Sequence, residues 1–101
     1  MKYGLTDSEF HFLIQNIVNP LKSLNAKVYI FGSRATGRHK KFSDIDLLFV
    51  ADPSRKINSQ QIYSITTFLE NSNFPYKVDL VSADELAESY RAGVEAEKIE
   101  I

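Results

Sequence analysis

Helix-type and strand-type hydrophobic patterns alternate along this chain, and that alternation constrains its fold more than any other feature. Apolar residues recur at helical spacing after Thr6, and Thr6 with Glu9 three residues later is typical of a capping box. We expect a first helix from about Asp7 to Leu24, bent near Pro20 because proline has no backbone N–H to donate. Alternating elements favour helices packed on a small sheet. The predicted fold class is therefore α/β, a small mixed β-sheet with helices packed on it.

The remaining predicted elements are short apolar or β-branched runs bounded by polar residues, glycine or proline. In chain order they are a strand from Lys27 to Phe31, a loop or short helix from Ser33 to Phe42, a strand from Asp44 to Val50, a helix from about Ser59 to Asn71, a strand from Tyr76 to Val81 and a short terminal strand from Lys98 to Ile101. Ser82 and Glu85 have the spacing of another capping box, so we expect a last helix to begin directly after Ser82.

The chain is short and nearly neutral, which restricts its chemistry. Its 101 residues predict a single domain, residues 1–101. The absence of cysteine excludes a disulfide scaffold, a thiol nucleophile and a cysteine-ligated zinc site. No apolar run is long enough to cross a bilayer and no signal-peptide pattern begins the chain, so we expect a cytoplasmic protein without membrane contact. The formal net charge of −1 argues against a protein held to nucleic acid mainly by charge.

Two aspartates, Asp44 and Asp46, interrupt an otherwise apolar strand. Aspartate is depleted in strands, and residues two apart point to the same face, with Cα atoms roughly 6–7 Å apart. Leu48 and Val50 continue this face and are apolar, so we expect the pair at the strand's beginning, on the rim of the sheet. A shared divalent cation would relieve the repulsion, and Mg²⁺ prefers such oxygen ligands. The alternative is two carboxylates on a solvated face.

The turn before this strand suits a polyphosphate. Gly32 permits a positive φ and the close approach of another group, and Ser33 is placed to open a short helix. Four cations without an acid follow it: Arg34, Arg38, Lys40 and Lys41. The alternative is an ordinary strand-to-helix turn with a serine cap, and for the two lysines a solvated loop or a partner-binding surface.

Asp79 is a third aspartate inside a β-branched run. If its strand pairs beside the strand of Asp46, Asp79 reaches the same rim, because neighbouring strands lie about 4.8 Å apart. The alternative is a surface carboxylate paired with Lys77, two residues away on the same face.

Gly32 and Ser33, followed after ten residues by Asp44 and Asp46, resemble the active-site motif of the DNA polymerase beta nucleotidyltransferase superfamily. The strings Gly-Ser-Arg-Ala-Thr-Gly at 32–37 and Ser-Asp-Ile-Asp-Leu at 43–47 resemble its minimal nucleotidyltransferase branch, in which the catalytic palm-like domain stands almost alone. The resemblance runs from the first strand to Asp79, which stands where the family keeps its third carboxylate. It implies a polymerase-beta-like nucleotidyltransferase palm.

The resemblance also implies a reaction, in which a hydroxyl attacks the α-phosphorus of a nucleoside triphosphate and pyrophosphate leaves. One or two Mg²⁺ ions would be bound. The implied site residues are the catalytic and metal-binding Asp44, Asp46 and Asp79 and the nucleotide-binding Gly32, Ser33 and Arg34. Arg34 would offset the charge that develops on the leaving pyrophosphate.

For the minimal branch, the resemblance implies a partner, a small helical HEPN-family toxin. The nucleotidyltransferase then acts as antitoxin by moving AMP from ATP, or from another nucleoside triphosphate, to a tyrosine hydroxyl of the toxin in a hetero-oligomer. The alternative is a catalytically idle, nucleotide-binding antitoxin that neutralises its HEPN partner by complex formation alone. A third alternative is a small-molecule nucleotidyltransferase that resembles the aminoglycoside-modifying enzymes. It is disfavoured, because those enzymes carry an additional acceptor domain that these 101 residues do not include. Direct nucleic-acid binding is not expected, because no basic track for it is present.

Overall fold

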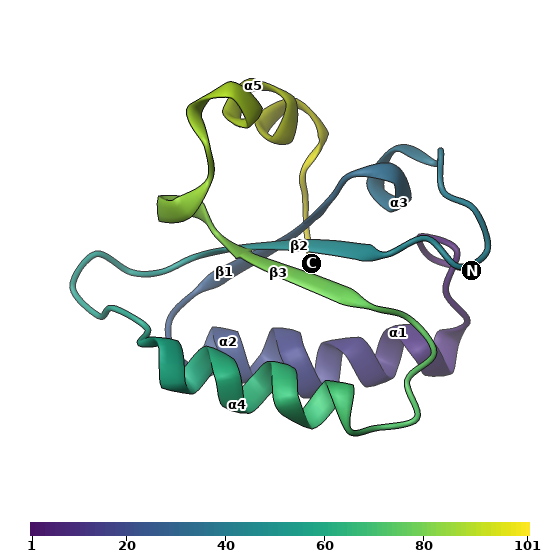
Figure 1. The fold of residues 1–101 in the computed structure, drawn as a ribbon, viewed down its shortest axis with the longest axis horizontal. Coiled ribbons are helices and arrows are strands. Elements are labelled where there is room, and N and C mark those ends of the chain that lie inside the picture. The colour runs from purple at the N-terminus through teal and green to yellow at the C-terminus, as the bar shows by residue number, and fades with distance from the viewer.

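The computed structural model describes residues 1–101 and contains one four-stranded sheet in the order β3-β2-β1-β4 (Figure 1). The strands are β1 (Lys27–Phe31), β2 (Ile45–Val50), β3 (Val78–Ser82) and β4 (Ile99–Glu100). β1 is antiparallel to both β2 and β4, whereas β2 and β3 are parallel. Parallel neighbours need a long crossover connection, which α4 (Ser59–Glu70) provides here. The predicted mixed α/β sheet is confirmed.

The predicted first helix is present as three consecutive segments, α1 (Asp7–Leu13), the π-helical η1 (Ile14–Val18) and α2 (Asn19–Ser23). Thr6 caps α1 through the predicted capping box with Glu9. The irregularity that we expected near Pro20 takes the form of the π-helical turn directly before α2. A proline that lacks an N–H to donate and a π-turn are both recognised causes of such a change in a long helix.

The last helix begins later than predicted. The Ser82 side chain caps no helix, and the chain makes only the short 3₁₀ turn η2 (Ala83–Glu85) before Leu86 becomes extended. α5 (Glu88–Glu97) then starts after Ala87. The prediction of a helix directly after Ser82 is wrong because this serine is still part of β3, paired with Phe49 of β2. The 3₁₀ turn closes with a single bond from the Leu86 N–H to the Ala83 carbonyl.

Other boundaries differ from the predictions by one or two residues. β2 starts at Ile45, so that Asp44 directly precedes the strand, and β3 runs from Val78 to Ser82. The loop after β1 contains a four-residue helix, α3 (Ser33–Thr36), which agrees with a short helix opening at Ser33. The terminal strand is confirmed as β4.

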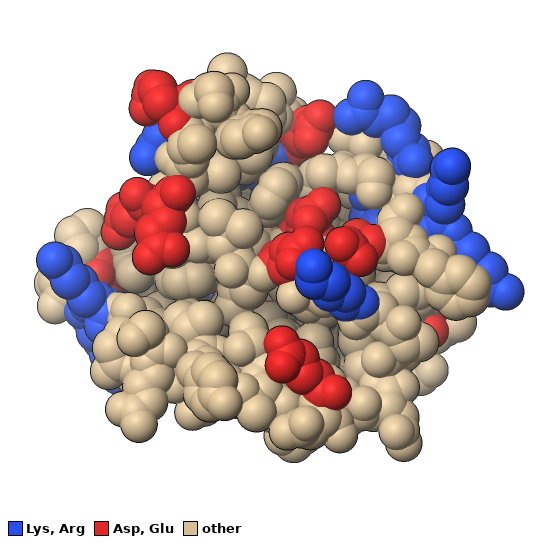
Figure 2. Space-filling model, viewed as in Figure 1, with Lys and Arg blue, Asp and Glu red and all other residues tan.

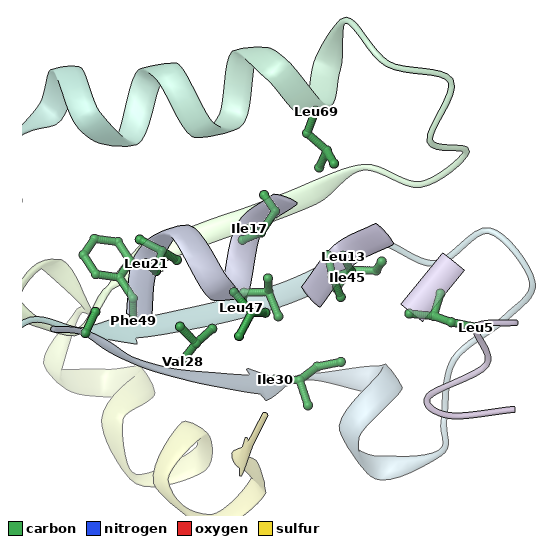
Figure 3. Packing of buried hydrophobic residues seen from close by; sticks show 12 residues of the cluster. Leu5, Leu13, Ile17, Leu21, Val28, Ile30, Ile45, Leu47, Phe49 and Leu69 are labelled. Atoms are coloured by element: carbon green, nitrogen blue, oxygen red, sulfur yellow. The ribbon is translucent and has the colours of Figure 1, made fainter. Parts of the chain in front are cut away.

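The hydrophobic core lies between the sheet and the helices on one of its faces (Figure 3). β2 contributes Ile45, Leu47 and Phe49 to it, while helical residues such as Leu13 and Ile17 pack from the other side. Because side chains alternate along a strand, Asp46 faces the opposite side of the sheet. On that side α5 lies over part of the sheet, whereas α1, α2 and α4 form the layer beneath it (Figure 1). None of the helices has the length and apolar character that a membrane span requires.

Candidate active site

The parallel pairing of β2 and β3 brings together two aspartates that are far apart in the sequence. Asp46 and Asp79 are direct partners in the register, so both side chains stand on the face opposite the core. Asp44 lies two residues before Asp46, exposed at the entry to β2. Figure 2 shows acidic side chains gathered at the centre of the view. We predicted that Asp79 would reach the rim of Asp44 and Asp46 if its strand paired beside theirs, and the pairing of β3 with β2 meets this condition.

The electrostatics of Asp46 reflect this neighbourhood. Its side chain is half-buried, and this burial is the first cause that raises its pKa above the usual value of a carboxyl. The negative charges of Asp79 and then Asp44 raise the pKa further, while Lys77 lowers it. The carboxylates of Asp79 and Asp44 thus both repel the carboxylate of Asp46. A bound cation would remove that repulsion.

The side chains do not form a preassembled metal centre. No three His, Asp or Glu side chains are gathered closely enough to hold an ion among them. Instead, Lys77 Nζ lies 3.5 Å from Asp79 Oδ1, with 70% and 42% of the two side chains exposed, as the alternative interpretation of Asp79 proposed. An exposed pair of this kind contributes only about 0–1 kcal/mol, so the Asp79 carboxylate can turn at little cost.

The residues present nevertheless fit Mg²⁺. This ion is commonly held by one or two carboxylates plus substrate phosphates, and all of the donors at this rim are oxygens. Asp46 in β2 and Asp44, whose charge is near enough to raise the pKa of Asp46, are the two candidate ligands closest in sequence. The metal-binding roles of Asp44, Asp46 and Asp79 stay predictions.

Gly32 explains why the motif needs a glycine beside the aspartates. Its φ of 76° and ψ of −155° lie in a region that is almost confined to glycine. A Cβ added at this position would collide with the Asp46 carboxylate. The backbone of the Gly32–Ser33 turn therefore passes directly beside Asp46, and Phe31 before it pairs with Asp46 across β1 and β2. The close approach that we predicted for Gly32 is made by this carboxylate.

Arg34 lies elsewhere than predicted. Its side chain belongs to the buried set, with only 2% of the residue exposed. Its guanidinium donates hydrogen bonds to the backbone carbonyls of Tyr3, Lys41 and Ser43 and stacks on the Tyr76 ring. The structure does not support the predicted contact of Arg34 with a leaving pyrophosphate, because the guanidinium is enclosed by protein groups that already take its hydrogen bonds.

The rest of the basic loop remains at the surface. Arg38, Lys40 and Lys41 are exposed, and Arg38 Nη2 forms an ion pair with Glu97 of α5 at 3.0 Å. Figure 2 shows basic side chains on the side of the molecule where Figure 1 places α3 and the loop after it. These exposed cations, and not Arg34, are available to anionic groups in this region.

A hollow beside Asp79 was not anticipated from the sequence. Its volume is about 390 Å³, and it lies between the end of α4 and the start of β3. Phe74, Tyr76 and Lys77 contribute to its wall together with Asp79. Pockets for small ligands begin at about 300 Å³, so the volume of this hollow lies in their range. Only the folding of α4 against β3 creates it, and no local sequence signal marks it.

Comparisons with known proteins agree with this geometry. The chain matches the family described as nucleotidyltransferase domain over residues 14–101. No curated protein is similar enough in sequence to match. Among solved structures, a proposed minimal nucleotidyltransferase is 28% identical with a TM-score of 0.67, and the match covers 95% of this chain and 97% of that one.

Two further solved structures show the same fold at lower identity. One is a toxin–antitoxin with AMP-PNP, 21% identical with a TM-score of 0.65, in which the match covers 85% of this chain and 69% of that chain. The other is a tri-AMPylated HEPN toxin from Shewanella oneidensis in complex with its MNT antitoxin, 18% identical with a TM-score of 0.63, covering 95% and 71%. With its match over residues 14–101 and the aspartate rim beside Gly32, this chain belongs to the nucleotidyltransferase domain family and has the fold of a minimal nucleotidyltransferase.

Proposed function

We propose that this protein is a Mg²⁺-dependent nucleotidyltransferase that moves AMP from ATP to a hydroxyl of a partner protein, a tyrosine of a HEPN toxin, and thereby acts as its antitoxin. The observation that carries the proposal is the rim itself. Asp46 and Asp79 are register partners, Asp44 is two residues away, and the Gly32 turn touches Asp46. The AMP-PNP in one toxin–antitoxin structure and the tri-AMPylated HEPN toxin in another support ATP and a HEPN acceptor.

Each residue of the rim has a defined task in this reaction. Asp44 and Asp46 would hold Mg²⁺, which supplies positive charge to the triphosphate when it is bound. Gly32 leaves room for the Asp46 carboxylate beside the turn and would offer its backbone to phosphate oxygens, and the Ser33 hydroxyl would donate a hydrogen bond to them. Asp79 accepts the proton of the acceptor hydroxyl, with Lys77 beside it as a counter-charge. The new bond joins the acceptor oxygen to the α-phosphorus as the bond to pyrophosphate breaks.

The direct test uses the protein with the HEPN protein encoded beside it, ATP labelled at the α-phosphate, and Mg²⁺. We expect label on the HEPN partner, and we expect Asp44→Asn and Asp46→Asn to abolish it. Asp84→Asn is the matched control, because Asp84 is an exposed acid in η2, outside the rim. Labelling that persists in Asp44→Asn would refute the assignment.

An antitoxin that works by binding alone is favoured by one observation, the ion pair that engages the Asp79 carboxylate with Lys77. The two functions separate in a growth assay with the toxin. Full neutralisation by the Asp44→Asn and Asp46→Asn variants identifies binding alone as sufficient, whereas loss of neutralisation together with loss of labelling identifies catalysis as the function.

A further inference from the structure

We infer that Arg34 is a positioning residue for the proposed active site, and that its buried guanidinium fixes the chain segment that presents Asp44. This inference rests on the proposed function for its catalytic readout. Among the buried residues of the chain, Arg34 is the single charged or polar one.

A buried cation of this kind has a cost that must be offset. Removing a charge from water is expensive unless the charge is paired or fully hydrogen-bonded. None of the ion pairs of the chain involves Arg34. The guanidinium is satisfied instead by four hydrogen bonds to backbone carbonyls and by the face of the Tyr76 ring, with its central carbon 4.6 Å from the ring centroid. An arginine held in this way fixes the positions of the backbone carbonyls that accept its hydrogen bonds.

The locked groups belong to the segment directly before Asp44. Nε and Nη2 of Arg34 both donate to the Ser43 carbonyl, at 3.0 and 2.9 Å, and Nη2 also donates to the Lys41 carbonyl at 3.3 Å. The Ser43 hydroxyl in turn accepts the backbone N–H of Lys40 at 2.8 Å. The peptide that leads into Asp44 is thus held by two donors of one rigid fork.

The same side chain also reaches the other parts of the site. Arg34 follows Ser33 within α3, so the fork anchors the turn that begins with Gly32. Nη1 donates to the Tyr3 carbonyl at 2.8 Å and ties the N-terminal turn to this region. The Tyr76 ring lies three residues before Asp79. The Arg34 guanidinium therefore links the turn at Gly32, the segment before β2 and the segment before β3.

Lysine is the informative replacement, because it keeps the positive charge but has no fork. An ammonium group is a point donor and cannot hold the Ser43 and Tyr3 carbonyls in the same directions. Partners that orient metal ligands typically change metal affinity or activity by about 10–100-fold when they are mutated. We therefore expect Arg34→Lys to bind Mn²⁺, the spectroscopically visible substitute for Mg²⁺, about tenfold more weakly than the wild type.

The experiment compares the wild type, Arg34→Lys and Arg91→Lys at a temperature at which circular dichroism shows all three to be folded. Arg91 is an exposed arginine of α5 that pairs with Glu88, so it is the matched control and should leave every quantity unchanged. Mn²⁺ affinity is measured by electron paramagnetic resonance. In the AMP-transfer assay we expect kcat to fall about tenfold or more in Arg34→Lys, with KM for ATP changed by less than about threefold. Asp44 is displaced in this variant, whereas the Gly32 turn is still held by the bonds that the Ala35 and Thr36 N–H groups donate to the Gly32 carbonyl.

Wild-type Mn²⁺ affinity in folded Arg34→Lys overturns the inference, and so does a loss of activity that only follows the unfolded fraction. If Arg34→Lys does not fold, Tyr76→Leu removes the ring below the guanidinium and must weaken Mn²⁺ binding in the same direction, and unchanged affinity there overturns the inference as well. A wild type that binds Mn²⁺ but transfers no AMP refutes the proposed reaction alone, while a wild type that binds no Mn²⁺ refutes both.

Discussion

At the scale of single residues, Asp46 is the point where the needs of folding and of the proposed chemistry oppose each other. Burial and the charges of Asp79 and Asp44 raise its pKa, so the ionised form is disfavoured in the folded protein. A carboxyl with a raised pKa in the folded state binds its proton more readily there than in the unfolded chain. Stability therefore falls as the pH rises through the interval from the unfolded pKa to the folded one.

Because the raised pKa of Asp46 makes stability fall as the pH rises, we expect Asp46→Asn to stabilise the metal-free protein at neutral pH. The amide cannot ionise, so the penalty of the charged carboxylate disappears, and the gain should shrink near pH 3, where the wild-type carboxyl is protonated. Thermal unfolding in a chelating buffer at about pH 3 and pH 7 measures both differences. Asp84→Asn, at an exposed acid, is the control. An Asp46→Asn variant less stable than the wild type at pH 7 contradicts the repulsion.

Gly32 permits a second prediction at this scale, with a control inside the same loop. Gly32→Ala adds a Cβ that meets the Asp46 carboxylate, whereas Gly37→Ala, at a similar φ of 77°, adds one that meets nothing within 4 Å. Both lose stability for the positive φ, about 1–2 kcal/mol at the left-handed helical Gly37 and more at Gly32, whose φ and ψ are almost confined to glycine. We expect Gly32→Ala to lose about 1–3 kcal/mol more, the usual cost of overpacking. Chemical denaturation measures the difference, and equal losses would show that the Asp46 contact is unimportant.

At the scale of elements, the three stretches with capping-box spacing show how far local patterns reach. Thr6 with Glu9 and Asn58 with Gln61 form the reciprocal bonds of the box, whereas Ser82 with Glu85 forms none. The first two precede continuous helices. Ser82 is still held by its pairing in β3, and Leu86 is extended, so the same spacing yields only a 3₁₀ turn. Pairing of Ser82 within the sheet therefore prevents it from capping a helix, and the local sequence does not reveal this pairing.

α5 supplies the prediction for this scale. Gly93 stands inside the helix, and a Cβ there would meet nothing within 4 Å. Alanine loses less backbone entropy than glycine on entering a helix, so Gly93→Ala should stabilise the protein by about 0.5–1 kcal/mol. The midpoint of urea denaturation measures this gain. A loss of stability would mean that α5 does not have regular helical geometry at Gly93.

At the scale of the whole molecule, one core supports the site. β2 runs through the sheet with Ile45, Leu47 and Phe49 on the helix side and Asp46 on the other, so packing on one face positions Asp46 on the opposite face. Leu47 is fully buried next to Asp46 and pairs with Leu80 in β3. The register that matches Asp46 to Asp79 is the register that this core enforces, because a slip by one residue would turn the apolar set outward.

Leu47→Ala should therefore affect both stability and the rim. Truncating a fully buried leucine costs about 2–5 kcal/mol, a large part of the about 5–15 kcal/mol that holds a domain together. Tyr63→Ala, on an exposed position of α4, should cost far less. Chemical denaturation of both variants measures the contrast. Equal losses would place the centre of the core away from β2.

The sequence by itself determined the order of the elements and the local motif. Hydrophobic periodicity marks helices and strands, and the motif marks Asp46 within a strand, Asp44 at its entry and the Gly32–Ser33 turn before both. Only the tertiary structure decided that Asp79 lies opposite Asp46, because that pairing depends on the crossover through α4. It also decided that Arg34 points inward, since the carbonyls that hold it come from Tyr3, Lys41 and Ser43, which meet only in the folded chain.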